Sequence, residues 1–245
     1  MNLPGLVIVV GTGILILVIA FFQRKAAPKL RVIQAFSRLY RAIGLSVEDG
    51  TRLLVGLGNE SLLSGHGAAA FSGLSMLRPL TQRTALSDRP PVATAGEGAL
   101  GLLAQDALQG GFDAAGFGEY FDPAAGRVAG LTPFSNAAGT LPILADERIS
   151  AAAMIGHFGP EAGLLADAAD REGVFMVGAS DDLVGQAVWF ASASEALIGE
   201  ELFVASAYVG GRPAQTASVT VQDILRWLII ASLLGGAVAK LFGFF

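Results

Sequence analysis

The stretch Ile149–Arg171, ISAAAMIGHFGPEAGLLADAADR, contains the pattern that decides the fold. A short apolar run typical of a buried strand ends at a glycine, and an acidic residue then opens a helical pattern. Similar strand-like runs recur along the chain, with helical patterns between or after them. These runs are Arg52–Val55, Pro91–Thr94, Val128–Leu131, Ile149–Ile155 and Val174–Val177. The alternation predicts an α/β fold with a mostly parallel sheet flanked by helices in Rossmann-like layers.

The helical patterns between the strands define the rest of the expected body. They cover Gly67–Gln82, Gly98–Leu108, Glu161–Arg171, Asp181–Ser192 and Ser194–Tyr208. The remaining segments, 110–126 and 132–146, are predicted as loops because turn residues interrupt them. No linker divides the body, so we expect one domain.

The composition is typical of a membrane protein with a modest water-facing part. Of 245 residues, 53% are hydrophobic and only 15% are charged, a balance too apolar for an ordinary soluble protein. The net charge of −5 argues against nucleic acid as a partner. Because the chain has no cysteine and two histidines, we expect no metal centre and no cofactor.

The N-terminal segment 3–22, LPGLVIVVGTGILILVIAFF, is predicted as a transmembrane helix. Twenty uncharged residues span about 30 Å as a helix, the thickness of the bilayer core. Basic residues follow the segment where a signal peptide would have a small-residue cleavage site, which favours an uncleaved anchor. The predicted contacts with lipid headgroups are Arg24, Lys25, Lys29 and Arg31. Since basic flanks stay cytoplasmic, we expect an inner (cell) membrane protein with its N-terminus outside and its main domain cytoplasmic.

Two regions of opposite charge follow this helix. Residues 24–47 are predicted to contain a basic amphipathic helix, which either lies in the membrane interface or packs on the body. Residues 48–223 form the predicted cytoplasmic α/β domain. That segment holds 21 acids and 8 bases, so its formal charge is −13.

A second transmembrane helix is predicted over residues 227–245. Small residues recur on one of its faces, which favours close packing against another helix. The residues predicted to make this membrane or oligomer contact are Ala231, Ser232, Gly235, Gly236 and Ala239. The sequence leaves open whether the partner is the first helix or a second copy of the chain.

The loops that follow the strands carry the candidate ligand-binding residues. These are His66, Gly96, Glu97, His157, Glu161, Ser180 and Asp181. The loops resemble nucleotide-cradling glycine loops, but carboxylates at the helix starts would repel a phosphate, and no P-loop motif is present. No catalytic residue is predicted, since no nucleophile-elbow motif occurs.

The two histidines allow two interpretations. If their loops were adjacent, the pair with Glu161 or Asp181 could bind a metal ion or shuttle protons. Otherwise both side chains cap or pack within loops. The pair Asp181 and Asp182 is likewise interpreted either as a helix start or as a site for a divalent cation.

Four stretches resemble a known family. They are EDGTRLLVGLGN (Glu48–Asn59), IGHFGPEAGLLAD (Ile155–Asp167), LIGEELFVASAYVGG (Leu197–Gly211) and QDILR (Gln222–Arg226). The chain is similar to an uncharacterised prokaryotic family, domain of unknown function 6754. This resemblance implies a membrane-tethered domain with no assigned reaction.

Two functional hypotheses follow. The first is a non-enzymatic membrane-anchored protein that self-assembles into a homo-oligomer or scaffolds a membrane complex. Its partners would be the lipid bilayer, further copies of itself or other subunits of the complex. The alternative is a membrane-tethered small-molecule-binding sensor or enzyme with a pocket at the carboxyl ends of the strands.

Overall fold

The computed structural model describes residues 3–23, 30–211 and 213–242. Its contacts divide the chain into two compact units. The body runs from Val32 to Gly210, and the described parts of the two terminal segments form the second unit.

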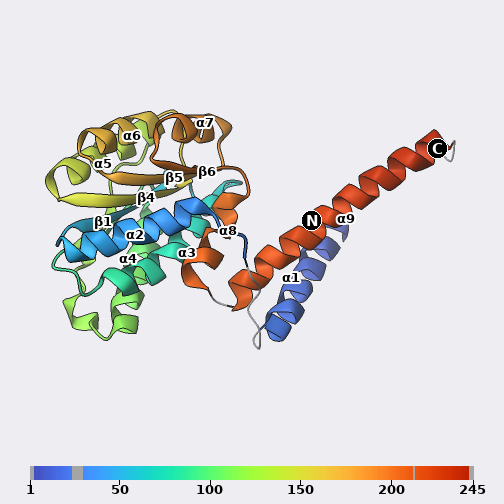
Figure 1. Ribbon diagram of the computed structural model, residues 1–245, viewed down its shortest axis with the longest axis horizontal. Coiled ribbons are helices and arrows are strands. Elements are labelled where there is room, and N and C mark those ends of the chain that lie inside the picture. The colour runs from blue at the N-terminus through green and yellow to red at the C-terminus, as the bar shows by residue number, and fades with distance from the viewer. Residues whose placement is uncertain (1–2, 24–29, 212, 243–245) are drawn as a thin grey trace. The chain divides into compact units, whose positions relative to one another are not determined.

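The body is built on one sheet of six parallel strands (Figure 1). The strands are β1 (Arg52–Gly58), β2 (Val92–Ala95), β3 (Gly126–Val128), β4 (Ile149–His157), β5 (Phe175–Ser180) and β6 (Glu195–Leu197). Their order across the sheet is β3-β2-β1-β4-β5-β6, and each neighbouring pair is parallel. The predicted fold class is therefore confirmed, with the strand order of a doubly wound sheet.

Helices cover both faces of this sheet. They are α2 (Gln34–Glu48), α3 (Gly67–Thr84), α4 (Gly98–Ala115), α5 (Pro133–Asp146), α6 (Ala162–Arg171), α7 (Leu183–Ser192) and α8 (Glu201–Gly210), with 3-10 turns η1 (Gly118–Tyr120) and η2 (Pro123–Ala125). Figure 1 shows α5, α6 and α7 on one face, and α2, α3, α4 and α8 on the other.

The central strand β4 explains why the sheet is buried on both faces. Ala151 and Ala153 belong to the core under α2, α3, α4 and α8, whereas Ala152 and Met154 belong to the core on the opposite face. All four side chains are fully buried. A strand covered on both faces needs a continuous apolar run, and that is the pattern of the sequence here.

Helix α2 packs on the body through its apolar face. Phe36, Leu39 and Ile43 are buried in the core, and the helix contacts β1, β4, β5 and β6. Arg38 on its other side forms an ion pair with Glu195, 2.5 Å apart. The sequence left open whether this amphipathic segment lies in the membrane interface or packs on the body. In the structure its apolar face packs on the body.

Three elements, α5, β6 and α8, differ from the sequence-based expectation, and β3 begins two residues before the predicted strand Val128–Leu131. Helix α5 occupies a segment predicted as a loop, because Thr132 forms a capping box with Ser135 and Pro133 suits the first turn of a helix. Strand β6 and helix α8 replace one predicted helix, since Gly199 between them adopts a φ of +61°.

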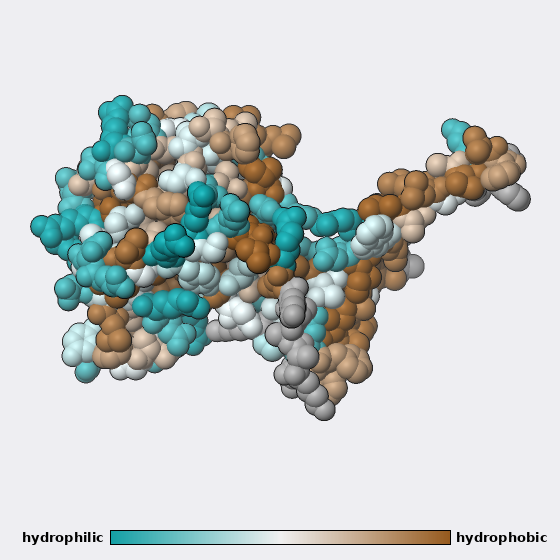
Figure 2. Space-filling view, viewed as in Figure 1, coloured by the Kyte–Doolittle hydropathy of each residue, from teal (hydrophilic) through white to brown (hydrophobic). Residues whose placement is uncertain are grey.

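The second unit contains two long helices, α1 (Leu3–Gln23) and α9 (Pro213–Leu241), which contact each other. Both are long and apolar enough to cross a membrane, over Gly5–Gln23 and Pro213–Val238. Figure 2 shows hydrophobic side chains along both helices. Helix α9 begins before the predicted span 227–245, and Gln23 donates a hydrogen bond to Thr220 within its extra turns. The predicted headgroup residues Arg24, Lys25 and Lys29 lie outside the described residues.

Candidate functional site

The direction in which the sheet is built reverses between β1 and β4. From β1 the chain continues through α3 to β2, whereas from β4 it continues through α6 to β5 on the other side. The loops after these two strands therefore diverge, and ligands of open α/β sheets bind at such a switch point.

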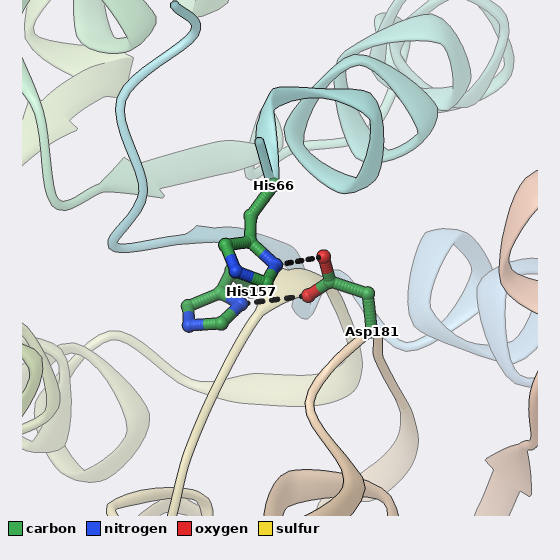
Figure 3. Close-up of side chains that lie close together, drawn as sticks. All are labelled: His66, His157 and Asp181. Atoms are coloured by element: carbon green, nitrogen blue, oxygen red, sulfur yellow. Dashed lines mark hydrogen bonds and ion pairs between the residues drawn. The ribbon is translucent and has the colours of Figure 1, made fainter. Parts of the chain in front are cut away.

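Asp181 connects two histidines at this position (Figure 3). Its Oδ2 lies 2.8 Å from Nδ1 of His66, and its Oδ1 lies 2.7 Å from Nδ1 of His157. The two imidazole rings lie side by side, with their centroids 4.5 Å apart. Each of the three residues offers one ligand atom, and these atoms lie within 4.8 Å of one another.

Three strand ends place these side chains. His157 is the last residue of β4, Asp181 directly follows β5, and His66 is the N-cap residue of α3 at the end of the loop after β1. Gly58 pairs with His157 in the sheet register and has a φ of +78°. A Cβ on Gly58 would lie 2.5 Å from the backbone oxygen of His157. Glycine therefore allows the β1 loop to turn directly beside His157.

The hydrogen bonds assign protons to the two rings. An ionised carboxylate only accepts, so His66 and His157 each donate from Nδ1. A neutral ring in this arrangement keeps an unprotonated Nε2. The hydrogen bond that His66 donates to Asp181, together with the negative charge of that carboxylate, raises the pKa of His66 above its usual value of 6.5.

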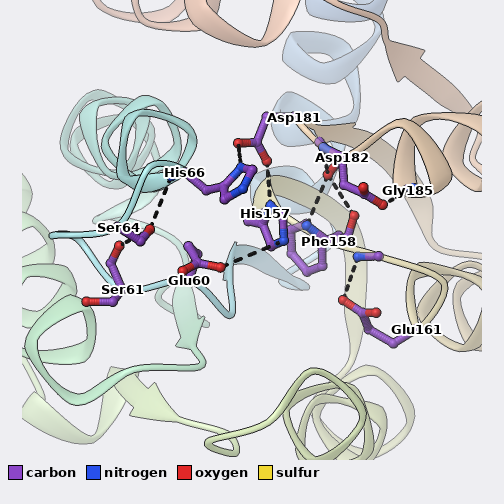
Figure 4. Close-up of polar contacts among 12 residues, drawn as sticks. Glu60, Ser61, Ser64, His66, His157, Phe158, Glu161, Asp181, Asp182 and Gly185 are labelled. Atoms are coloured by element: carbon purple, nitrogen blue, oxygen red, sulfur yellow. Dashed lines mark hydrogen bonds and ion pairs between the residues drawn. The ribbon is translucent and has the colours of Figure 1, made fainter.

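Glu60 is a further member of the site that sequence reasoning missed (Figure 4). Its Oε2 lies 3.8 Å from Nε2 of His157. The available signal was its place: it is an acidic residue directly after β1, the strand next to the switch point. Its side chain is 27% exposed and that of His157 is 22% exposed, so solvent reaches both groups at this edge of the sheet.

Two other predicted ligand-binding residues are engaged by backbone groups. The carboxylate of Glu97 accepts a hydrogen bond from the backbone N–H of Leu100 and so caps α4. The backbone N–H of Gly96 donates to the carbonyl of Gly58 at 2.9 Å, and a Cβ on Gly96 would clash with the side chain of Asn59. Both residues therefore have structural roles.

Glu161 and Ser180 are buried and also structural. Oε1 of Glu161 accepts from the N–H of Gly159 at 2.7 Å, away from the histidines. The hydroxyl of Ser180 donates to the carbonyl of Phe158 and accepts from its N–H. Asp182 accepts from the N–H of Gly185 and caps α7, so the neighbouring acids Asp181 and Asp182 have different partners.

A hollow of about 430 Å³ lies at the other edge of the sheet. It is lined by the start of β5, the end of α7 and the second half of α6, including Asp170, Met176 and Ser194. It is therefore remote from the three residues that the strand ends bring together.

Comparison with known families assigns the chain to one of them. A family model matches residues 2–245, nearly the whole sequence. The chain belongs to the family described as Domain of unknown function (DUF6754). The resemblance inferred from four sequence stretches is thus confirmed, whereas the prokaryotic source and the membrane anchor stay predictions. No curated protein and no solved structure matches this member of the family.

We predict that His66 titrates above pH 6.5 in the full chain and that Asp181→Asn returns its pKa to the ordinary range. The carboxylate stabilises the charged ring, so this contribution to stability is complete below the unfolded pKa and is lost as pH rises through the folded one. An NMR titration of the two histidine side chains measures both effects. Asp170→Asn is the matched control, and an unchanged His66 titration in Asp181→Asn would contradict the assignment.

Proposed function

We propose that the chain is a membrane-anchored sensor whose α/β body binds a small cationic ligand at the carboxyl edge of the sheet. The observation that carries this proposal is the shared hydrogen bonding of Asp181 to His66 and His157. Two loops from different halves of the sheet converge there on one carboxylate. Such a convergence of polar groups at a switch point is typical of a binding site.

The charges of the surrounding loops favour a cation. The loops at the carboxyl edge comprise residues 59–66, 96–97, 129–132, 157–161, 181–182 and 198–200. They contain six carboxylates and neither lysine nor arginine. Glu97 and Asp182 also occupy helix starts where a phosphate would bind. The local field therefore attracts cations and repels phosphates.

The engaged state of Ser180 favours binding over covalent catalysis. Its hydroxyl is buried and hydrogen bonded to Phe158 and Asp182, so it is not presented to a substrate. The histidines and Asp181 offer lone pairs and protons but no activated nucleophile. For this reason we propose a sensor rather than a hydrolase or transferase.

We predict that a cation at this site perturbs the side-chain NMR signals of both histidines. The chain contains only these two, so each signal is assigned by one variant, and the protein is prepared without a histidine tag. Zn²⁺, Mg²⁺ and putrescine serve as probes in nanodiscs of the full chain. At least one is expected to shift both rings, and His66→Ala is expected to weaken that binding at least tenfold.

The control for this experiment is Glu119→Gln, an acid on η1 that faces solvent. It should bind as the wild type does. If none of the three probes at millimolar concentration shifts either ring, the sensor proposal is wrong.

We further propose that the N-terminus lies outside the inner membrane and the body lies in the cytoplasm. The support is the basic segment after α1 and the acidic body that follows it in the sequence.

The orientation can be tested by cysteine labelling. The chain has no cysteine, so single cysteines report topology directly. With an impermeant maleimide on intact spheroplasts, Asn2→Cys should be labelled, whereas Leu63→Cys, at an exposed loop position, should react only after permeabilisation. The reverse pattern would refute this orientation.

A second function, self-assembly or scaffolding of a membrane complex, is favoured by one face of α9. Among the described residues, no atom other than those of the adjacent residues and the nearby backbone of α9 itself lies within 4 Å of a Cβ placed on Gly235 or Gly236. Ala231 and Ser232 are exposed as well, and the side chain of Ala239 is not described. The small-residue face is therefore not covered by α1, and we propose that it packs on α9 of a second copy.

We predict that Gly235→Leu reduces the particle to a monomer in nanodiscs or mild detergent. A bulky side chain would prevent the close helix approach that small residues allow. Mass photometry measures the change. Ala237→Leu on the opposite side of α9 is the control and should leave the oligomer intact; a wild-type monomer would rule out self-assembly.

A further inference from the structure

Three features of the site indicate the type of cation. They are the orientation of the two rings, the position of Glu60 and the charges at the site. We propose that the ligand is a divalent transition-metal ion of the zinc type, bound by Nε2 of His66, Nε2 of His157 and the carboxylate of Glu60. Asp181 is the positioning residue that orients both rings. This inference rests on the proposed cation site and names its ligand.

The first step of the argument concerns Asp181. Its oxygens lie 2.7 Å and 2.8 Å from the two Nδ1 atoms. Two ligands of a tetrahedral zinc ion lie about 3.3–3.5 Å apart, given bonds of about 2.0–2.1 Å. The observed contacts are thus hydrogen bonds. A carboxylate that accepts from one ring nitrogen commonly fixes a metal-binding histidine so that the other nitrogen meets the ion.

The second step concerns the free ring nitrogens. Figure 3 shows that both rings turn their other nitrogen away from Asp181. In the neutral form of each ring Nδ1 carries the proton, so Nε2 presents a lone pair to a metal ion. One carboxylate holds the two imidazoles side by side, with ring centroids 4.5 Å apart, and the three residues form a group that could hold a metal ion.

Glu60 supplies the third group. Its Oε2 and Nε2 of His157 are 3.8 Å apart, which is too long for a hydrogen bond. That separation does admit an ion between them, because a metal bonded to both atoms keeps them more than 3 Å apart. Figure 4 shows the Glu60 carboxylate on the Nε2 side of His157.

The donor set selects the class of metal. Two imidazoles and one carboxylate suit zinc, iron and related ions, whereas Mg²⁺ and Ca²⁺ prefer oxygen ligands alone. The charges also balance, since Glu60 and Asp181 together offset the two positive charges of the ion. The loops at the carboxyl edge of the sheet contain no lysine or arginine to compete with it.

The test is a cobalt titration of the full chain in nanodiscs, prepared without a histidine tag. We expect one Co²⁺ per chain, with visible absorption far stronger than that of hydrated cobalt, and displacement by an equimolar amount of Zn²⁺. His66→Ala and Glu60→Gln should each weaken binding at least tenfold. His66 is half exposed, with 53% of its side chain accessible, so its replacement does not threaten the core.

Asp181→Asn tests the positioning role separately. A residue that orients ligands changes affinity by about 10–100-fold. The cobalt spectrum of this variant should keep its wavelength at saturation, because the three ligands remain. A shifted spectrum would make Asp181 a ligand instead and would overturn the assignment of Glu60. Glu119→Gln again serves as the unaffected control.

The outcomes separate this inference from the proposed function. If Mg²⁺ or putrescine shifts the histidine signals while Co²⁺ gives only the hydrated spectrum, the transition-metal assignment is wrong and the cation sensor stands. If cobalt binds equally well to the double variant His66→Ala/His157→Ala, the metal lies elsewhere and the inference is refuted. If no cation shifts the rings, both proposals fail together.

Discussion

The parallel pairing of β1 with β4 is the interaction on which the rest of the body depends. These two strands start the two halves of the sheet, and their register runs from Arg52 opposite Ile149 to Gly58 opposite His157. Crossover helices return the chain to the start of each new strand, which keeps all the strands parallel. The carboxyl ends of all the strands therefore lie at the same edge of the sheet. That geometry brings the loop after β1, with Glu60 and His66, to the end of β4 at His157. Without this pairing the site residues would have no reason to meet.

The sequence predicts the sheet well because the relevant signals are local. The alternation of apolar runs and helical patterns requires only the residues of each segment, and the buried alanines of β4 account for its unbroken apolar run. Helix α5 was missed because its two prolines and its glycine resemble a loop; the cap formed by Thr132 outweighs them. Strand β6 is three residues long, too short for any periodicity to appear.

The candidate site could be predicted only in part, because its geometry depends on strand order. His66 and Asp181 are 115 residues apart in the chain. No local sequence pattern predicts that β1 and β5 lie on either side of β4. The acidic helix starts could be interpreted from the sequence alone: Glu97 and Asp182 cap their own helices as first-turn chemistry suggests. Glu60 was overlooked because a single acid in a glycine-rich loop has no distinguishing spacing.

Helix α3 connects the candidate site with α8, the last helix of the body. It starts directly after His66, its N-cap residue, and within two turns the hydroxyl of Ser72 donates to the backbone carbonyl of Leu202 in α8. Helix α8 ends at Gly210, and α9 begins at Pro213. Helix α3 thus begins beside Asp181 and is hydrogen bonded to α8. The element that carries His66 at its start therefore also holds α8, so one helix sets both the position of this histidine and the packing of the last helix of the body.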